Sequence, residues 1–253
     1  MSTLDLVVAV SAAVGPRVAD ETFALTLDAV PLAQTEVSDV HGTRFHLAEH
    51  VGPGHLSVRY AATLESVAPA VETGPAELIQ YRRPSRYCES DRIGPLARSQ
   101  FVGIEGPDLL SAISSWVGTH IEYVTGSSRP IDGAVATLLA REGVCRDFAH
   151  LVIALLRACD VPARFASVYA PGLSPMDFHA VAEAYVDGDW HVVDATCLAP
   201  RSAMVRIATG RDAADASFLS TSLGVIRLES VEVTAYTDGD LPVDDVTRLT
   251  KLR

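Results

Sequence analysis

The chain has 253 residues, with 20 Lys and Arg against 32 Asp and Glu and a formal charge of −12 at pH 7. Apolar residues make up 48% and charged residues 21%, values typical of globular proteins, which excludes a disordered, collagen-like or coiled-coil chain. Because so acidic a chain repels phosphate backbones and anionic lipids, a nucleic-acid or membrane-surface role is disfavoured.

The cysteines and the N-terminus indicate where the protein works. The chain has four cysteines, too few for a disulfide scaffold, and none of them lies in a CxxC pair or a zinc-finger spacing. Asp5 stands where a signal peptide would carry a basic residue, and no apolar run approaches the ~20 residues of a membrane span. We therefore expect a soluble cytoplasmic protein with reduced thiols and no membrane partner.

Residues 1 to about 75 lack helical periodicity and predict a small all-β domain. Short strands are expected over 4–10, 22–27, 43–48 and 55–64. Gly52-Pro53-Gly54 separates the last two, which predicts that they pair antiparallel. Four histidines also lie in this region: His41, His46, His50 and His55. Their spacing fits no tight metal-ligand set, so we expect exposed or hydrogen-bonded side chains.

A proline-containing stretch over 66–84 predicts a domain junction, after which the pattern becomes helical. Apolar spacing predicts helices over 107–121 and 131–140 and a third that begins at about Cys145 and ends before Pro162. Strands are then expected over 164–170, 178–186, 190–195 and, as one or two, 223–236. Asp187-Gly188-Asp189 predicts a hairpin turn between the second and third of these.

Cys145 is a candidate nucleophile because it opens an apolar helix. Unpaired backbone N–H groups, the helix dipole and the neighbouring Arg146 all favour the thiolate. The alternative is a packed, inert thiol. A thiol nucleophile needs a base and an orienting group, and His179 and Asp194 lie toward the same open end of the predicted hairpin. If Glu183 pairs with Asp194, His179 is ~13 Å away along the strand, and contact requires a bulge, a bend or another register.

The segment Gly143 to His150 resembles the nucleophile motif of the transglutaminase-like superfamily, especially its bacterial branch. Asp177 to Tyr185 resembles that family's histidine strand, and Trp190 to Thr196 resembles its aspartate strand. The order Cys, His, Asp matches, with separations of 34 and 15 residues. The resemblance covers about residues 85–220.

The resemblance implies an α+β fold: a papain-like core of helices packed on an antiparallel sheet, over 76–253, preceded by the all-β domain over 1–75. It implies that Cys145 is the nucleophile, His179 the general base and then acid, and Asp194 the residue that orients His179. The implied reaction is acyl transfer from a peptide or protein amide through a thioester. Water as acceptor would make the protein a protease or amidase, and an amine co-substrate would make it a transglutaminase.

The sequence leaves several points open. It does not identify the side-chain donor of an oxyanion hole; Trp116, Tyr87 and Trp190 are candidates, each more typical of packing. Glu183 is expected to be a solvated carboxylate, with a supporting role behind His179, on the same strand face, as the alternative. His150 and His191 are expected to be structural residues, while Cys197 could approach the site. No nucleotide, calcium or zinc motif is present, so no cofactor or metal is expected. The alternative function is a non-catalytic peptide- or protein-binding module, and the oligomeric state is undetermined.

Overall fold

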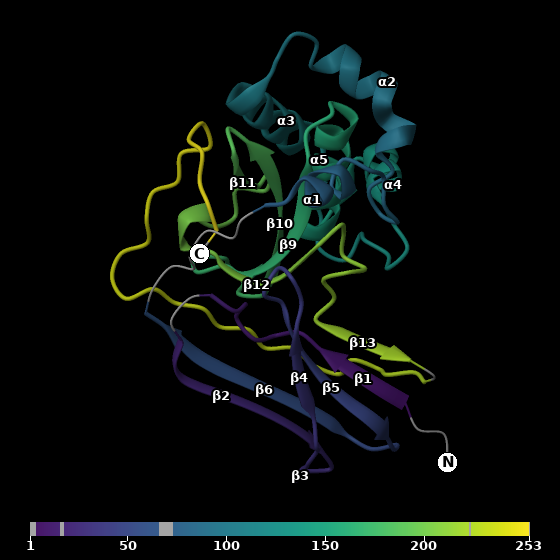
Figure 1. The fold of residues 1–253 in the computed structure, drawn as a ribbon, viewed down its shortest axis with the longest axis vertical. Helices are drawn as coiled ribbons and strands as arrows, with labels where there is room; N and C mark the ends of the chain where they lie inside the picture. Colours follow the sequence, from purple (N-terminus) through teal and green to yellow (C-terminus); the bar gives the residue numbers. More distant parts are fainter. Residues whose placement is uncertain (1–3, 16–17, 66–72, 223, 253) are drawn as a thin grey trace.

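The computed structural model describes residues 4–15, 18–65, 73–222 and 224–252. It has an α+β architecture in which two small sheets lie at one end of the molecule and a third sheet, covered by helices, lies at the other (Figure 1). The α+β fold predicted from the sequence is confirmed. None of the helices in the described ranges combines the length and apolar character that crossing a membrane requires.

The two small antiparallel sheets come mainly from the N-terminal part of the chain (Figure 1). One has the strand order β13-β1-β5-β4 and the other the order β3-β2-β6. Their strands are β1 (Leu4–Val8), β2 (Val18–Leu27), β3 (Val30–Pro31), β4 (Thr35–Ser38), β5 (Arg44–Val51), β6 (Leu56–Leu64) and β13 (Leu219–Ser222). Apolar side chains of both sheets, among them Leu6, Val8 and Leu25, share one buried core, so the sheets form a small sandwich.

The connection after β5 differs from the sequence prediction. β5 pairs with β1 and β4 whereas β6 pairs with β2, so the predicted antiparallel pair of 43–48 and 55–64 is wrong. The turn at Gly52-Pro53-Gly54 instead carries the chain from one sheet to the other. The His55 N–H donates to Oδ1 of Asp28 at 2.8 Å, and the Asp28 N–H donates to the His55 carbonyl at 2.9 Å. These bonds fix the start of β6 beside the turn between β2 and β3.

The larger part of the molecule is built on an antiparallel sheet of strand order β11-β10-β9-β12. Its strands are β9 (Ala163–Tyr169), β10 (Phe178–Val186), β11 (Asp189–Val193) and β12 (Val205–Gly210). Its helices are α1 (Pro75–Gln80), α2 (Ser90–Gln100), α3 (Gly106–His120), α4 (Ala134–Ala140) and α5 (Cys145–Ala158). Two short strands, β7 (Glu122–Tyr123) and β8 (Glu142–Gly143), pair in parallel, and a 3₁₀ turn spans Arg201–Ala203. The helices predicted over 107–121, over 131–140 and from Cys145 and the three strands predicted within 164–195 are thus confirmed.

Helix α5 lies at the centre of this part, against the sheet on one side and against α2, α3 and α4 on the others (Figure 1). Every residue from Asp147 to Arg157 is buried. A helix buried on all sides is typical of a protein core. Because α5 packs directly on β9 and β10, its first residue, Cys145, has a fixed position relative to the sheet.

Hydrogen bonds join the sandwich to the larger part. The Ala13 N–H donates to the Arg206 carbonyl on β12 at 2.9 Å, and the Tyr169 hydroxyl on β9 donates to the Val10 carbonyl at 2.6 Å. The chain later returns to the sandwich, where β13 pairs antiparallel with β1. The domain boundary expected near residue 75 stays a prediction.

The strands expected over 223–236 do not form in the described part of that segment, residues 224–236. Residue 223 lies outside the described residues. The side chains of Val225 and Tyr236 are 94% and 78% exposed. Apolar residues here therefore do not mark a buried strand face, which is why their pattern misled the prediction.

A buried ion network crosses the large sheet beneath α1. Glu183 on β10 is 1% exposed, not solvated as expected from the sequence. It accepts bonds from Arg164 at 2.8 Å and, through both oxygens, from Arg206 at 2.6 Å. Arg164 also donates to Glu77 of α1 at 3.0 Å. Burial alone would raise the pKa of Glu183, but the two guanidinium charges outweigh burial and lower the pKa to about 2.

We predict that Glu183→Gln lowers the free energy of unfolding at neutral pH by about 3–5 kcal/mol, because it leaves two buried guanidinium groups without their counter-charge. Since the folded-state pKa lies below the unfolded value of 4.5, this stabilisation is complete above that value and is lost as the pH falls toward 2. Urea unfolding of wild type and variant across this range measures the difference. Glu229→Gln, at an exposed ion pair, is the control, and equal losses in both variants would contradict the prediction.

Candidate active site

Cys145 is the first residue of α5 and is partly exposed. Val144 is the N-cap, and its backbone N–H donates to Oδ2 of Asp147 at 2.9 Å. The Asp147 side chain thus folds back over the start of the helix. A Cβ on Gly143 would lie 2.8 Å from the Asp147 Cβ, so the close approach requires glycine here. This compact turn presents Cys145 at the positive end of the helix dipole.

Arg146 anchors the loop that precedes α4. Its Nη2 donates to Oγ of Ser128 at 2.5 Å and to the carbonyl of Arg129 at 2.7 Å. The same atom contacts Oδ1 of Asp147 at 3.1 Å. The Arg146 charge is therefore engaged next to the candidate nucleophile rather than free in solvent.

The fold brings His179 and Asp194 into direct contact. Nε2 of His179 donates to Oδ2 of Asp194 at 2.9 Å, and the two residues are only 2% and 3% exposed. Of the alternatives that the sequence leaves open, the structure shows another register: the hairpin turns at Asp187-Gly188, and Glu183 pairs with Val192 rather than with Asp194. This register shifts Asp194 two residues toward His179, leaving ~7 Å of strand length for the two side chains to span.

The second carboxylate oxygen of Asp194 is held by Thr196, two residues later in the chain. Oδ1 accepts bonds from the Thr196 backbone N–H at 2.9 Å and the Thr196 hydroxyl at 2.7 Å. The Asp194 carbonyl accepts a bond from Oγ of Ser114 on α3 at 3.3 Å. A Cβ on Gly118 would lie 2.7 Å from the Ala195 carbonyl oxygen, so α3 packs directly on this turn. Thr196 and Ser114 were not predicted, since a hydroxyl carries no sequence signal for this role.

His179 has one ring nitrogen left for chemistry. Nδ1 is buried and makes no hydrogen bond within the described residues. Burial opposes protonation of the ring, but the hydrogen bond to Asp194 and the nearby Cys145 sulfur outweigh it and raise the pKa of His179 to about 10. The charged imidazolium form is thus favoured beside the thiol.

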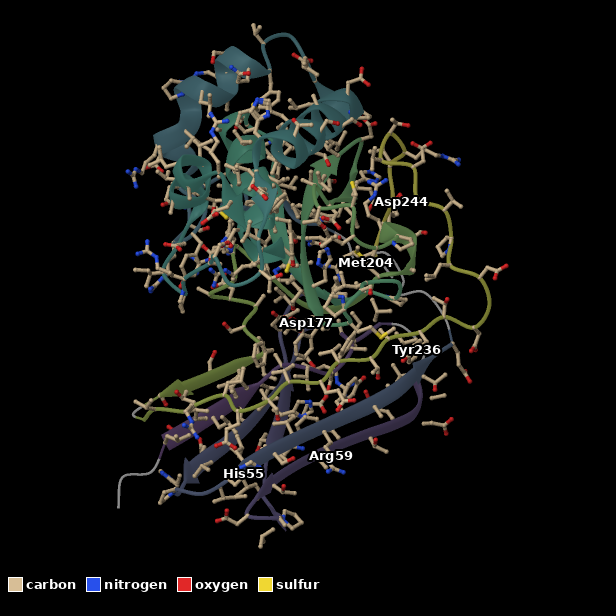
Figure 2. All side chains as sticks on the ribbon, turned by 180° about the vertical axis from the view of Figure 1, so that it is seen from behind. His55, Arg59, Asp177, Met204, Tyr236 and Asp244 are labelled. Carbon is tan, nitrogen blue, oxygen red and sulfur yellow. The ribbon has the colours of Figure 1, made fainter. Side chains whose placement is uncertain are left out.

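Asp177, two residues before His179, lies where the helical part of the molecule meets the sandwich (Figure 2).

Other residues singled out in the sequence lie away from this contact or have other partners. His150 is fully buried, stacks on Tyr87 with ring centroids 5.2 Å apart, and accepts a bond from the Ala213 N–H, a structural role as expected. His191 is a buried residue of β11. Cys197 is exposed, and its Sγ lies 3.8 Å from the Asp194 carbonyl oxygen. Cys197 therefore does approach the turn that carries Asp194.

The three residues considered as oxyanion donors have other neighbours. The Tyr87 hydroxyl donates to the Pro130 carbonyl at 3.0 Å, and Nε1 of Trp190 donates to Oγ1 of Thr73 at 2.9 Å. Trp116 stacks on His120 of its own helix, with ring centroids 4.3 Å apart.

Tyr123 of β7, which the sequence did not single out, instead contacts Cys145. Tyr123 pairs with Gly143, two residues before Cys145, and both the backbone N–H and the side chain of Cys145 act on the pKa of its hydroxyl. The only sequence signal for it is an aromatic residue after the helix that ends at His120, and that signal is weak.

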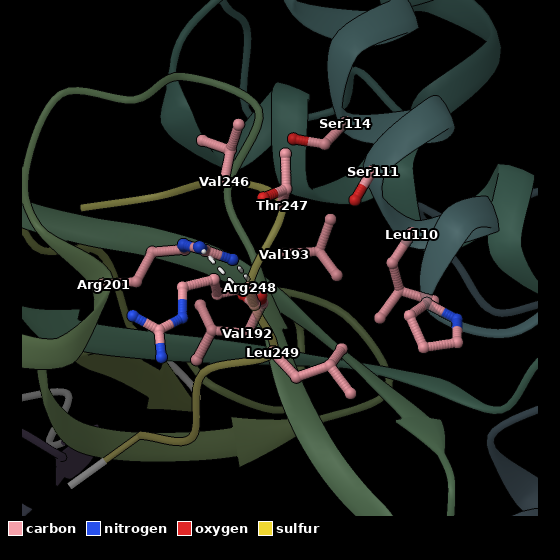
Figure 3. A pocket seen from close by; sticks show the side chains of 11 residues that line it. Leu110, Ser111, Ser114, Val192, Val193, Arg201, Val246, Thr247, Arg248 and Leu249 are labelled. Carbon is pink, nitrogen blue, oxygen red and sulfur yellow. Dashed lines mark hydrogen bonds between the residues drawn. The ribbon is translucent and has the colours of Figure 1, made fainter.

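The C-terminal segment braces the strand that leads to Asp194 (Figure 3). β11 is an edge strand, and its Val192 N–H donates to the Thr250 carbonyl at 2.7 Å. Arg201, 5% exposed, donates to the carbonyls of Val192 at 3.1 Å and Arg248 at 3.2 Å and forms an ion pair with Asp244 at 2.9 Å. Figure 2 shows Asp244 on this segment beside the larger part of the molecule.

The described residues contain no group of three or more His, Cys, Asp or Glu side chains that could hold a metal ion. The four N-terminal histidines are dispersed. Nε2 of His46 is 2.8 Å from Oγ of Ser11, Nε2 of His41 is 2.8 Å from the Tyr81 hydroxyl, and the other two are exposed. The candidate site brings together residues of α5, β7, β10 and the turn after β11.

Comparison with known proteins agrees with this architecture. The family model described as transglutaminase-like superfamily matches residues 105–195, which include Cys145, His179 and Asp194. A solved structure of a candidate cysteine protease from Cytophaga hutchinsonii is 35% identical and covers 94% of this chain and 90% of that one, with a TM-score of 0.76. The fold is thus a papain-like α+β fold preceded by strands, as the sequence predicted. The chain belongs to the transglutaminase-like superfamily.

Shorter matches link the chain to mycobacterial proteins. An uncharacterized protein of Mycobacterium tuberculosis is 44% identical over 62 residues, which is 24% of this chain and 20% of that protein. An uncharacterized protein of Mycobacterium leprae is 26% identical over 116 residues, 41% of this chain and 40% of that protein. The matched segments thus span about a fifth and two fifths of these relatives' lengths.

We predict that Arg201→Met lowers the free energy of unfolding by about 2–4 kcal/mol, because the Val192 and Arg248 carbonyls lose a buried donor and Asp244 loses its partner. Urea unfolding followed by circular dichroism measures the loss. Arg227→Met, at an exposed ion pair, is the matched control and should change stability little. A similarly small loss in Arg201→Met would show that the C-terminal segment does not brace β11.

Proposed function

We propose that the chain is a cysteine-dependent enzyme that cleaves amide bonds of a peptide or protein through a thioester on Cys145. The observation that carries the proposal is the buried 2.9 Å hydrogen bond between His179 and Asp194. The other ring nitrogen has no hydrogen-bond partner within the described residues, and Asp194 together with the neighbouring Cys145 raises the pKa of the ring. A nucleophile, a base and an orienting carboxylate are the groups that this chemistry needs.

The acylation step follows from the chemistry of the three groups. The proton of Cys145 moves to Nδ1 of His179, and the thiolate attacks the carbonyl carbon of the substrate amide. The bond to the leaving nitrogen then breaks as the imidazolium donates its proton to the departing amine. Asp194 keeps the ring oriented and stabilises its positive charge throughout, and the backbone N–H of Cys145 is a candidate donor to the developing oxyanion.

The second step decides the reaction class. Water, deprotonated by His179, would attack the thioester and release a carboxylic acid, which restores the free thiol and makes the protein a protease or amidase. A primary amine in place of water would give a new amide and make it a transglutaminase. We favour hydrolysis, which the description of the Cytophaga hutchinsonii relative as a candidate cysteine protease supports. The cytoplasmic location stays a prediction.

At about pH 7 iodoacetamide is expected to alkylate Cys145 faster than the other three thiols, since the neighbouring His179 ring can accept the thiol proton. Cys197 is an internal control, because the residue is exposed to the reagent. Partial burial of its thiol and the nearby Asp194 charge raise the pKa of Cys197, so it should react slowly. His179→Ala should slow alkylation of Cys145 by about 10²-fold, the lower end of typical acid–base effects. Peptide mapping by mass spectrometry gives each rate.

His191→Ala, which removes a buried histidine from the neighbouring strand, is the matched variant and should leave the Cys145 rate nearly unchanged. Equal alkylation rates at Cys145 and Cys197, with no effect of His179→Ala, would instead favour a non-catalytic binding module on this fold.

Incubation with a panel of peptide amides should give a covalent acyl adduct on Cys145, visible as a mass increase of the intact protein. Cys145→Ala should form no adduct, whereas Cys197→Ala should form it normally. Adding methylamine separates the two outcomes, because hydrolysis yields the peptide acid and aminolysis the methylamide. Absence of any adduct and any product across the panel, despite fast alkylation of Cys145, would contradict the proposed enzyme.

A further inference from the structure

Strands β7 and β8 place Tyr123 beside the start of α5. The two strands pair in parallel with Tyr123 opposite Gly143, two residues before Cys145. The next N–H, that of Val124, donates to the Gly143 carbonyl at 3.0 Å and locks this register. The Tyr123 ring also contacts Phe148, with ring centroids 5.9 Å apart. Since Phe148 follows Cys145 by three residues, both lie on one face of the helix, and the tyrosine packs against that face.

The strand register and the ring contact place the Tyr123 side chain close to the start of α5. The backbone N–H and the side chain of Cys145 both act on the pKa of its hydroxyl. Burial, followed by the Cys145 charge, raises the pKa of Tyr123 to about 12, so the hydroxyl keeps its proton at neutral pH. The side chain is nevertheless 41% exposed, which leaves it within reach of a bound substrate.

The proposed reaction needs a donor at this place. When a thiolate adds to an amide carbonyl, the carbonyl oxygen becomes an oxyanion on the same carbon that binds the sulfur. The backbone N–H of Cys145 can reach that oxygen, and a second donor on the same side strengthens its stabilisation. Tyr87 and Trp190, which the sequence suggested for this role, donate elsewhere, whereas Tyr123 lies beside the start of α5, where the Cys145 N–H acts on its hydroxyl.

We propose that Tyr123 is the side-chain donor of the oxyanion hole, a role that rests on the proposed acyl-transfer function. In the free protein its hydroxyl occupies the position next to the Cys145 N–H. When the substrate carbonyl oxygen takes that N–H, the hydroxyl moves aside and donates its proton in a hydrogen bond to the same oxygen. No bond to the tyrosine forms or breaks, and the proton stays on the phenol.

The test compares two reactions of Cys145 that differ only in whether an oxyanion forms. Tyr123→Phe keeps the ring against Phe148 and removes only the hydroxyl. Acylation by a peptide amide or by a matching peptide ester should slow by about 10²–10³-fold, the usual loss for one oxyanion donor. Alkylation by iodoacetamide, which attacks saturated carbon and forms no oxyanion, should change by less than about threefold. Tyr87→Phe, whose hydroxyl bonds to Pro130, is the matched control and should affect neither reaction.

If the wild-type protein is acylated, three results in Tyr123→Phe would overturn the role of Tyr123 alone. An unchanged acylation rate would show that the hydroxyl has no role, and a faster rate would show that it only covers the thiol. An equal loss in acylation and alkylation would show that the hydroxyl acts on the sulfur rather than on the oxyanion. A wild-type protein that is alkylated rapidly but never acylated would overturn the proposed function together with this role.

Discussion

A single buried hydrogen bond, donated by Nε2 of His179 to Asp194, governs the chemistry of the candidate site. It uses one ring nitrogen and so leaves Nδ1 as the atom that can exchange a proton with Cys145. In a buried setting a ring without this carboxylate would lose its proton, since burial acts against the charged form. The carboxylate reverses that tendency. The proposed nucleophile, base and orienting group therefore depend on one bond between two neighbouring strands.

Much of the surrounding structure serves to hold that bond in place. Helix α5 is buried on all sides, so Cys145 cannot move independently of the sheet. Three contacts hold the end of β11 and the turn after it. Thr196 donates to the Asp194 carboxylate, and Ser114 of α3 donates to the Asp194 carbonyl. The C-terminal segment accepts a bond from the Val192 N–H. The Glu183 network fixes β9, β10 and β12 against each other a few residues away. Precise placement of catalytic groups generally requires such support from neighbouring elements.

The core elements could be predicted from the sequence because their signals are local. Helical spacing after Cys145 gave the helix, and Asp187-Gly188 marked the hairpin that carries His179. The register of that hairpin was left open by the sequence, since a change in which residues form the turn shifts every pair along it. The predicted partner of β6 was wrong, because the choice between two sheets depends on contacts far apart in the chain. Tyr123 was missed for the same reason: its position opposite Gly143 depends on strand pairing that no local pattern reveals.

An NMR titration of the histidine ring nitrogens in isotopically labelled protein tests the His179–Asp194 interaction most directly. We expect that one of the eight histidines stays doubly protonated well above neutral pH, with a pKa of about 10, and that its signals disappear in His179→Gln. Asp194→Asn should return the pKa of this ring toward or below its ordinary value. If every histidine titrates at or below about pH 6.5, the usual value for the side chain, then Asp194 and Cys145 do not act on His179 as described, and the central claim is contradicted.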